Sequence, residues 1–210
     1  PDNVDLRQGA LIEPLSVACH DVARARVVAG ENVVVIGGGP IGQLIAAVAK
    51  AEGANVLISE INPQRRAFAQ ARGIAAIDPS AADLTAYVNE WTQGAGADAV
   101  FEVAGVAPAV AAMTEIAAVR GRICIVAIHT EAPRVDLFRF FWRELEMVGA
   151  RVYGASDFDR AIALVASGAV DIDSFITDEF PLENIADAFR NANRNPRSMK
   201  SIVKCGGDIV

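Results

Sequence analysis

Basic residues, histidine and long apolar runs are scarce in this chain of 210 residues. Lys and Arg total 19 against 26 Asp and Glu, and the net charge of -7 provides no basic surface for phosphate backbones or anionic membranes. No apolar run reaches the roughly 18 residues that span a bilayer. The amino-terminal segment lacks the basic start and apolar centre of a signal peptide. We therefore expect a cytoplasmic protein without a nucleic-acid or membrane partner.

Cysteine is equally sparse, with Cys19, Cys124 and Cys205 far apart in the sequence. Their spacing excludes a zinc finger or a redox dithiol, and their odd number argues against a disulfide framework. Cys124 lies in an apolar run, where it is expected to act as a small buried hydrophobic residue. The chain begins with Pro1 in place of Met, so we expect a piece of a longer polypeptide, although processing or the design of the expressed segment would give the same start.

Apolar residues are abundant, at 52% of the sequence. Between residues 32 and 128, short β-branched runs alternate with Ala-rich stretches of helical period, a pattern typical of βαβ units and a parallel sheet. The predicted fold class is therefore α/β. Residues 33–36 are continuously apolar, as expected of a central strand covered on both faces. A helix is predicted over residues 41–50, and Gly53 ends it.

Residues 1–152 contain enough predicted strands for a doubly wound, parallel, six-stranded sheet. The strands are expected at residues 32–36, 56–59, 75–77, 99–102, 123–128 and 145–148. Further helices are expected at residues 63–72, 84–91 and 107–118, and an entry helix at 13–28. After about residue 152 the pattern changes to helices at 158–166 and 182–192 and strands at 175–180 and 202–205. Residues 153–210 are therefore predicted to form a short α+β C-terminal appendage.

The first strand and the next helix are joined by Gly37, Gly39 and Gly42. In this spacing the first glycine permits a tight turn, the second lets the backbone approach a pyrophosphate, and the third lets the helix pack close to the strand. The helix N-terminus offers amides and a positive dipole end to the phosphates, with Ile41 the better donor because Pro40 has no N–H. Any Gly-rich strand-to-helix turn can match the spacing. Its position between a buried strand and a helix favours a Rossmann dinucleotide site.

Glu60 ends the second strand, eighteen residues beyond Gly42. A carboxylate at this place can accept both ribose hydroxyls of NAD and repel the 2′-phosphate of NADP, so NAD is the favoured cofactor. A solvated acid at a strand end is the alternative explanation. Arg65 and Arg66 leave NADP open, because a nearby arginine can accommodate its phosphate, but they also fit an ordinary helix surface.

Other catalytic patterns are missing from the sequence. Tyr87 and Tyr153 are not followed by a lysine four residues later, so the tyrosine-lysine pair of short-chain dehydrogenases is absent. Neither a Gly-x-Ser-x-Gly elbow nor a His-Glu-x-x-His motif occurs. His20 and His129 are the only histidines, and a structural role is the simpler explanation for each.

Several further segments are typical of one protein family. They are Glu-Pro-Leu-Ser-Val at 13–17, Phe-Glu-Val-Ala-Gly at 101–105, Gly-Arg-Ile at 121–123, Val-Ala-Ile-His at 126–129, Glu-Leu-Glu-Met-Val-Gly at 144–149, and residues 180–189. Together with the glycine run, they make nearly the whole chain resemble the medium-chain zinc-dependent alcohol dehydrogenase family, on its sorbitol, butanediol and threonine dehydrogenase side. The resemblance implies oxidation of a secondary alcohol or polyol, with hydride transfer to NAD and zinc as a Lewis acid.

The resemblance also implies a set of cofactor contacts along one end of the sheet. It assigns Ile41 to the pyrophosphate, Glu60 and Arg65 to the adenosine ribose, Val103 and Ala104 to the adenosine side, and Val17, Val126, Ala127, Ile128, Ala150 and Val152 to the nicotinamide. Ala127 stands where the family often has glycine, so that contact can differ in detail. Because the family usually associates through the edge of this sheet, a homodimer or homotetramer with residues 123–149 at the interface is implied.

Glu13 falls where relatives supply a catalytic-zinc ligand or a carboxylate close to the metal. A first-turn acid favoured by the helix dipole explains it equally well. Relatives bring a cysteine and a histidine to that zinc from an N-terminal domain, and they carry a separate four-cysteine zinc site. This sequence contains neither set, so it contains no assigned catalytic residue, and the resemblance implies that residues 153–210 pack with the missing domain and that this chain alone is inactive.

Two other functions are compatible with the sequence. One is a stand-alone NAD-binding or regulatory module, and the other is the cofactor domain of a zinc-free reductase of the same superfamily. Glu13 followed by Pro14 argues against the reductase.

Overall fold

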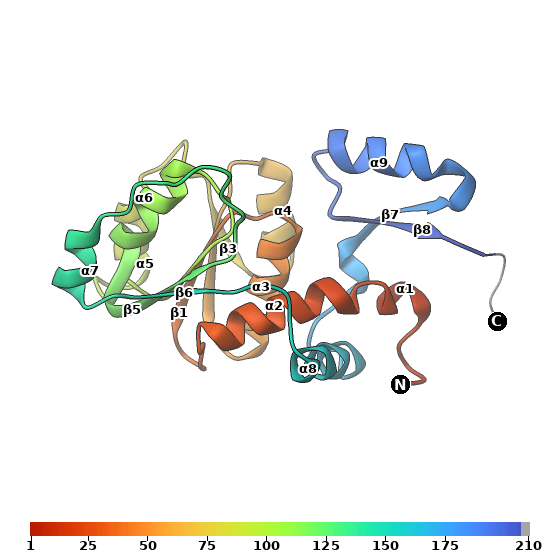
Figure 1. Cartoon of the computed structure of the whole chain (residues 1–210), viewed down its shortest axis with the longest axis horizontal. Helices are drawn as coiled ribbons and strands as arrows, with labels where there is room; N and C mark the ends of the chain where they lie inside the picture. The colour runs from red at the N-terminus through yellow and green to blue at the C-terminus, as the bar shows by residue number, and fades with distance from the viewer. Residues whose placement is uncertain (207–210) are drawn as a thin grey trace.

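A six-stranded parallel sheet forms the centre of the computed structural model, which describes residues 1–206 (Figure 1). The strand order is β3-β2-β1-β4-β5-β6, the order of a doubly wound Rossmann sheet. The strands are β1 Asn32–Ile36, β2 Asn55–Ser59, β3 Ala75–Ile77, β4 Ala97–Glu102, β5 Ala117–Ile125 and β6 Glu146–Gly149. The predicted α/β fold class and six-stranded sheet are confirmed.

The central strand β1 explains why the sheet needs a continuous apolar run. Successive side chains of a strand point to opposite faces. Val33 and Val35 enter the hydrophobic cluster on one face, whereas Val34 and Ile36 enter the cluster on the other. Because helices cover both faces, every side chain in this run is buried.

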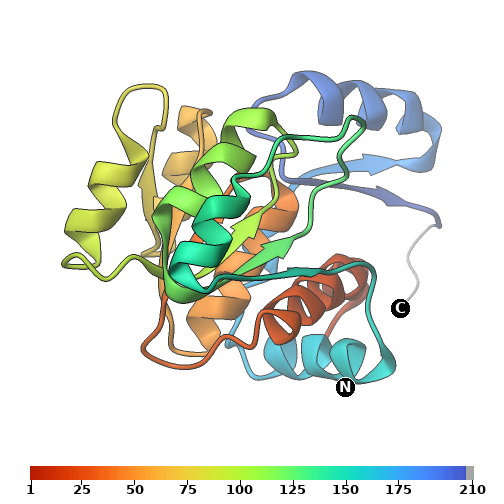
Figure 2. The ribbon, with the colours of Figure 1, turned by 60° about the vertical axis from the view of Figure 1, so that its left-hand side comes forward.

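Helices form a layer on each face of the sheet (Figures 1 and 2). The face of Val33 and Val35 is covered by α2 Ile12–Arg24, α3 Pro40–Ala51, α4 Pro63–Ala71 and α8 Ala155–Ala166. The other face is covered by α5 Leu84–Trp91, α6 Ala107–Ile116 and α7 Leu137–Arg143. A four-residue helix, α1 Leu6–Gly9, precedes α2.

Side-chain caps set the start of several helices. Asn62 Oδ1 accepts a hydrogen bond from Gln64 N at 2.8 Å at the start of α4, and Asp136 Oδ1 accepts one from Phe138 N at 3.0 Å at the start of α7. Helix α7 was not predicted from the sequence. None of its residues is buried, so its apolar side chains do not produce the core-facing helical period on which such a prediction depends.

Several predicted boundaries were wrong; the predicted helix at 158–166, for example, begins at Ala155, and the predicted helix at 107–118 ends at Ile116. The entry helix ends at Arg24 rather than at 28, because Arg26 adopts a left-handed φ of 54°. Strand β5 begins at Ala117 rather than at 123, through an irregular start in which its register with β4 shifts. It ends at Ile125 rather than at 128, because Val126 N and Ala127 N both donate to Glu102 O and the chain turns there.

The C-terminal segment contains a second, two-stranded parallel sheet of β7 Ile176–Pro181 and β8 Lys200–Lys204. The 3₁₀ turns η1 Asp173–Phe175 and η2 Leu182–Asn184 flank β7, and α9 Ile185–Arg194 lies over the small sheet (Figure 1). The predicted α+β appendage is therefore confirmed in its composition. The predicted helix at 182–192 is divided between η2 and α9.

Helix α8 lies beyond the predicted boundary at residue 152, yet it packs on α2. Ala161 and Val165 belong to the same buried cluster as α2 and α3, and His20 Nδ1 donates to Asp157 Oδ2 at 2.9 Å. The division into 1–152 and 153–210 stays a prediction. The last four residues of the second segment lie outside the described residues.

Two sequence-based expectations concern membranes and cysteines. Within residues 1–206, no helix is both long enough and apolar enough to cross a membrane. Cys19, Cys124 and Cys205 are all free, and Cys124 is fully buried as predicted. Burial raises the pKa of its thiol to about 12, so Cys124 is an inert packing residue.

Asp21 on α2 is an exception to the rule that buried polar groups are hydrogen-bonded. The residue has no exposed surface, and neither carboxylate oxygen has a partner among the described residues. Burial in the apolar cluster, reinforced by the negative charge of Asp157, raises the pKa of Asp21 to about 7. Between about pH 4 and pH 7 the folded chain therefore holds a proton on Asp21 that the unfolded chain releases.

We predict that replacing Asp21 with alanine stabilises the protein in a pH-dependent way. The carboxyl group ionises near 3.8 when unfolded and near 7 when folded, so its presence lowers the free energy of unfolding progressively as the pH rises from about 4 to about 7. This shift corresponds to about 4 kcal/mol in full. Urea unfolding at several pH values should show Asp21→Ala gaining stability over the parent chain through that window and levelling off above it.

The matched control is Asp159→Ala, which removes an exposed carboxylate from α8. It should change the free energy of unfolding little at any pH. A constant difference between Asp21→Ala and the parent chain from pH 4 to pH 8 would contradict the raised pKa.

Candidate functional site

The carboxyl ends of the strands are aligned by a row of backbone hydrogen bonds that continues one residue past the sheet. In each case the amide of the first loop residue donates to the last carbonyl of a neighbouring strand. The bonds are Gly37 N to Ser59 O at 2.8 Å, Glu60 N to Ile77 O at 3.0 Å, Val103 N to Ile36 O at 3.0 Å, Val126 N to Glu102 O at 3.0 Å, and Ala150 N to Ile125 O at 3.1 Å. All five donors are residues that the sequence predicts to contact the cofactor.

The glycine turn after β1 has the geometry that its spacing predicted. Gly37 has a φ of 107°, which side-chain-bearing residues rarely adopt. A Cβ atom at Gly42 would lie 1.9 Å from Gly37 O, so the third glycine lets α3 pack directly on the turn. At Gly39 the nearest atom to such a Cβ is an Arg65 guanidinium nitrogen at 3.7 Å, so no protein backbone demands glycine there.

Helix α3 begins at Pro40, with Gly39 as an N-cap that has no side chain to satisfy the first amides. An α-helix leaves its first N–H groups without intrahelical partners. Since Pro40 has no N–H, Ile41 N and Gly42 N are the first amides the helix can present. They lie at the positive end of the helix dipole, where an anion is stabilised.

Glu60 lies directly beneath this turn and is 6% exposed. One carboxylate oxygen accepts from Gly38 N at 2.8 Å, and the other accepts from Asn62 N at 2.7 Å. A Cβ atom at Gly38 would lie 3.0 Å from Glu60 Cβ. Gly38 was not among the predicted site residues, yet its missing side chain lets the carboxylate sit against the glycine turn.

The two arginines of α4 have different surroundings. Arg66 NH1 donates to Glu60 O and Ile61 O and forms an ion pair with Asp78 at 2.9 Å, so its guanidinium is held by the protein. Arg65 NH1 lies 3.7 Å from a Glu60 carboxylate oxygen, and its buried Nε has no partner among the described residues. Arg65 is therefore the arginine that remains available to a ligand beside Glu60.

A pocket of about 620 Å³ opens at this edge of the sheet. Six predicted cofactor residues line it, namely Gly37, Gly39, Glu60, Arg65, Val103 and Ala104. The rest of its wall was not predicted and consists of Ile36, Ser59, Ile61, Pro79, Leu84, Val106, Pro108, Ala109 and Ala112. These residues come from the start of α5, the start of α6 and the carboxyl ends of β1, β2 and β3. Only those of α6, which follow one another at helical spacing, could be grouped from the sequence.

The other predicted cofactor residues follow β5 and β6 along the same edge or lie on helices beside it. Val126 and Ala150 are half-buried against the core, and Ala127 lies beside Gly105, whose added Cβ would be 3.4 Å from Ala127 Cβ. Ile128 is 91% exposed. Val17 is half-buried on α2, and Pro40 and Ile41 are half-buried at the start of α3.

Val152 is the one predicted cofactor residue with a strained backbone, since its φ is 62°. A β-branched residue in the left-handed region costs roughly 1–3 kcal/mol, which the surrounding structure must offset. The strain marks the segment after β6 as one whose path is imposed by its neighbours.

A buried carboxylate also organises the loops after β4 and β5. Glu102 has no exposed surface. Its Oε1 accepts from Ala104 N at 3.1 Å and Gly105 N at 2.8 Å, and its Oε2 accepts from His129 Nε2 at 2.9 Å. His129 therefore has a structural partner and fixes the loop after β5 to the loop after β4.

Glu13 is exposed in the first turn of α2. Its carboxylate is close enough to Lys200 of β8 to oppose the lowering of the Lys200 pKa that burial of that ammonium group causes. Among residues 1–206, no group of three or more His, Cys, Asp or Glu side chains is placed to hold a metal ion. The described residues thus do not by themselves fit a catalytic zinc.

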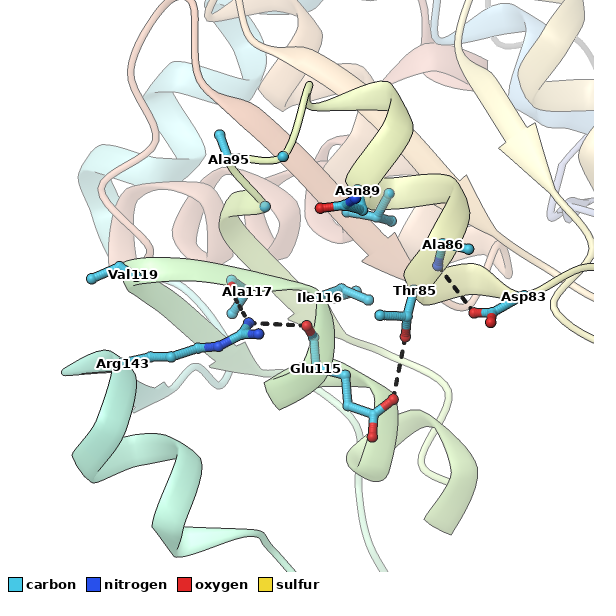
Figure 3. Close-up of a pocket in the computed structure, with 13 residues that line it drawn as sticks. Asp83, Thr85, Ala86, Asn89, Ala95, Glu115, Ile116, Ala117, Val119 and Arg143 are labelled. Atoms are coloured by element: carbon cyan, nitrogen blue, oxygen red, sulfur yellow. Dashed lines mark hydrogen bonds between the residues drawn. The ribbon is translucent and has the colours of Figure 1, made fainter.

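A second cavity, of about 450 Å³, lies at the opposite edge of the sheet, before β4 and β5. Figure 3 shows that the side chains of Arg143, Thr85 and Asp83 are already hydrogen-bonded within the protein. Arg143 NH1 donates to Glu115 O and Ala117 O, and Thr85 Oγ1 donates to Glu115 Oε2. Ligands of doubly wound sheets bind at the carboxyl ends of the strands, so this cavity is a structural gap between α5, α6 and α7.

The sequence matches the family model described as zinc-binding dehydrogenase over residues 40–167, more than half of its length. The chain belongs to the zinc-binding dehydrogenase family, and the resemblance inferred from its motifs is confirmed.

Three individual proteins are similar to the chain over almost its whole length. The chain is 58% identical over 208 residues to 2-dehydro-3-deoxy-L-galactonate 5-dehydrogenase of Pseudoalteromonas atlantica, covering 99% of this chain and 61% of that protein. The crystal structure of 2R,3R-butanediol dehydrogenase from Bacillus subtilis superposes with a TM-score of 0.94 at 29% identity, covering 98% of this chain and 60% of the other. A putative zinc-binding dehydrogenase from Sinorhizobium meliloti bound to NADP has a TM-score of 0.85 at 32% identity, covering 97% of this chain and 60% of the other. The chain therefore spans about 60% of the length of these relatives.

The glycine geometry predicts that two similar substitutions destabilise the chain to different extents. Gly42→Ala should lower the free energy of unfolding by at least about 2 kcal/mol, because its Cβ would collide with Gly37 O and push α3 away from β1. Gly39→Ala should cost no more than about 1 kcal/mol, because it has room and loses only the preference for glycine over alanine at an N-cap. Urea unfolding of both variants measures the contrast, and equal stability of the two would contradict it.

Proposed function

We propose that this chain is the NAD-binding domain of a zinc-dependent dehydrogenase that oxidises a secondary alcohol or polyol. The observation that carries the proposal is the carboxylate of Glu60, held beneath the glycine turn at the edge of the pocket. Membership of the zinc-binding dehydrogenase family supports the reaction class. The 58% identical relative is named for a galactonate derivative, which supports a polyhydroxylated sugar acid as one form of the substrate.

In this proposal the dinucleotide lies across the carboxyl edge of the sheet. The amide of Ile41 faces the pyrophosphate, and the absent side chain of Gly39 allows its close approach, while Gly37 and Gly42 permit the tight turn and the close packing of α3. Glu60 accepts the hydroxyls of the adenosine ribose, with Arg65 beside it. The adenosine side is bounded by Val103 and Ala104.

The nicotinamide end lies along the loops after β5 and β6. There the proposal assigns contacts to Val17, Val126, Ala127, Ile128, Ala150 and Val152. When bound, NAD supplies the nicotinamide ring that accepts a hydride. The chain's own part is to fix that ring, and the Glu102 contacts to Ala104 N and His129 keep the adjoining loops in place.

Zinc enters the proposal only with residues beyond this sequence. Glu13, exposed at the start of α2, would be a ligand or a carboxylate close to the metal in the complete enzyme. Because the described residues offer no cluster for zinc, the chain alone is expected to catalyse no reaction. It is also expected to bind NAD weakly, since the rest of the enzyme is not there to complete the site.

A homodimer or homotetramer is the proposed assembly, formed through residues 123–149. Strand β6 is one of the two edge strands of the large sheet, and an edge strand can pair with another chain. Beside it, α7 exposes Phe138, Phe141 and Trp142, with Phe138 and Trp142 stacked at 6.1 Å. Exposed aromatic side chains next to an open strand edge favour a second copy of the chain as the partner.

We further propose a cytoplasmic location without nucleic-acid or membrane partners. The net charge of -7 supports the absence of such partners, because anionic surfaces would repel the chain.

The cofactor preference predicts that NAD binds more tightly than NADP in calorimetric titration. Glu60→Ala should narrow that difference by about tenfold or more, because it removes the ribose acceptor and the charge that repels a 2′-phosphate. Glu60→Gln removes the negative charge but keeps an oxygen that accepts from Gly38 N. It therefore separates the effect of losing the charge from the effect of losing the side chain. The control Glu90→Ala removes an exposed carboxylate from α5 and should leave the preference unchanged. Equal affinities of the parent chain for NAD and NADP would overturn the ribose argument.

The proposed interface predicts that Trp142→Glu converts the oligomer to a monomer in light scattering after size exclusion. A charge in the centre of an apolar contact would be desolvated without a partner. The control Phe189→Glu changes an aromatic side chain of α9 that is 68% exposed, and it should leave the mass unchanged. A parent chain that is monomeric at tens of micromolar would contradict the proposed assembly.

A further inference from the structure

Ser59, the last residue of β2, has a side chain that the fold does not explain. The residue is 2% exposed, and its hydroxyl has no hydrogen-bond partner among the described residues. Leaving a buried hydroxyl without a partner costs about 1–3 kcal/mol in proteins. Alanine or valine would pack at the same place without that cost.

The neighbours of Ser59 make the hydroxyl an isolated polar group. Its register partners in the sheet are Ile36 on β1 and Ile77 on β3. Both isoleucines belong to the cluster on the face covered by α5 and α6, which also holds Leu57 of the same strand. Since residues two apart in a strand share a face, the Ser59 side chain lies on that face too.

The same residue lines the pocket proposed for the adenosine half of the cofactor. The pocket wall there is apolar, with Leu84 from α5 and Val106, Ala109 and Ala112 from α6 and the residues before it. Successive residues of a strand point to opposite faces, so Glu60 reaches the glycine turn while Ser59 faces this apolar wall. A nucleoside whose ribose contacts Glu60 would therefore extend its base toward Ser59.

We propose that Ser59 Oγ donates a hydrogen bond to a ring nitrogen of the adenine base of the dinucleotide. An apolar wall accepts any flat base, whereas a single buried donor selects a base with an acceptor opposite it. The apolar wall provides contact area for the base, and the Ser59 hydroxyl discriminates between bases. This inference rests on the proposed dinucleotide function and adds a determinant of base recognition to it.

The test is calorimetric titration of the chain with AMP and with NADH, comparing the parent and Ser59→Ala. The expected result is a loss of about 3- to 10-fold in affinity for both ligands, the range of a single net hydrogen bond. In the unliganded chain, Ser59→Ala should have an equal or higher melting temperature, because it removes a hydroxyl without a partner. A merely structural serine would give the opposite pattern, with lower stability and unchanged affinity.

The matched control is Ser16→Ala on α2. Ser16 is also buried, but its hydroxyl donates to Ile12 O at 2.7 Å. Removing that satisfied bond should lower the melting temperature and leave the affinity for AMP unchanged. Ser59→Ala is therefore expected to lose affinity without losing stability, and Ser16→Ala to lose stability without losing affinity.

Deaza analogues of AMP, in which C–H replaces N1, N3 or N7 in turn, identify the acceptor. One analogue should bind the parent chain about 3- to 10-fold more weakly, and Ser59→Ala should then cause no further loss with that analogue. Ser59→Thr, which keeps the hydroxyl, should retain more of the AMP affinity than Ser59→Ala.

The failures of the two proposals are distinguishable. If the parent chain binds neither AMP nor NADH, the dinucleotide function itself is wrong. If it binds both and responds to Glu60→Gln, but Ser59→Ala binds AMP as tightly as the parent, only the role of Ser59 is overturned.

Discussion

The alignment of parallel strand ends is the constraint on which the rest of this molecule depends. Because all six strands run the same way, their carboxyl ends meet at one edge, and five loop amides extend the ladder beyond it. Gly37, Glu60, Val103, Val126 and Ala150 are fixed by this ladder before any ligand is present. The loops that follow can carry binding groups because their first residues are hydrogen-bonded to the sheet.

The three buried carboxylates among the described residues differ in whether they have hydrogen-bond partners. Glu60 and Glu102 each accept two backbone amides, and both lie where a strand gives way to a loop. These carboxylates hold loops in position, and Glu102 adds His129 to the same arrangement. Asp21 has no such partner, and burial raises its pKa to about 7. Hydrogen bonding therefore separates the carboxylates that organise the binding edge from the one that weakens the core.

Local pattern was sufficient for most of the sheet. The continuous apolar run at 33–36 predicted a strand covered on both faces, and helical spacing with glycine or proline at the ends predicted α3 and α4. Helix α7 was not predicted, because none of its residues is buried and its apolar residues therefore do not recur at the spacing of a core-facing helix. The start of β5 was missed because Ala117 and Ala118 continue the Ala-rich run that predicted a helix over 107–118, whereas α6 ends at Ile116. Family motifs carried the remaining inference, from a generic Rossmann unit to a zinc-binding dehydrogenase.

The sequence by itself determined the fold class, the glycine turn and the acid at the end of the second strand, because each depends on short-range spacing, and the resemblance of its motifs indicated the family. Only the tertiary structure decided which distant residues share the pocket. It placed Ala109 and Ala112 of α6 opposite Ser59, put Gly38 against Glu60, and paired His129 with Glu102. These contacts join segments on different strands and helices. They follow from the order in which the strands pair, and this order cannot be read from a local sequence pattern.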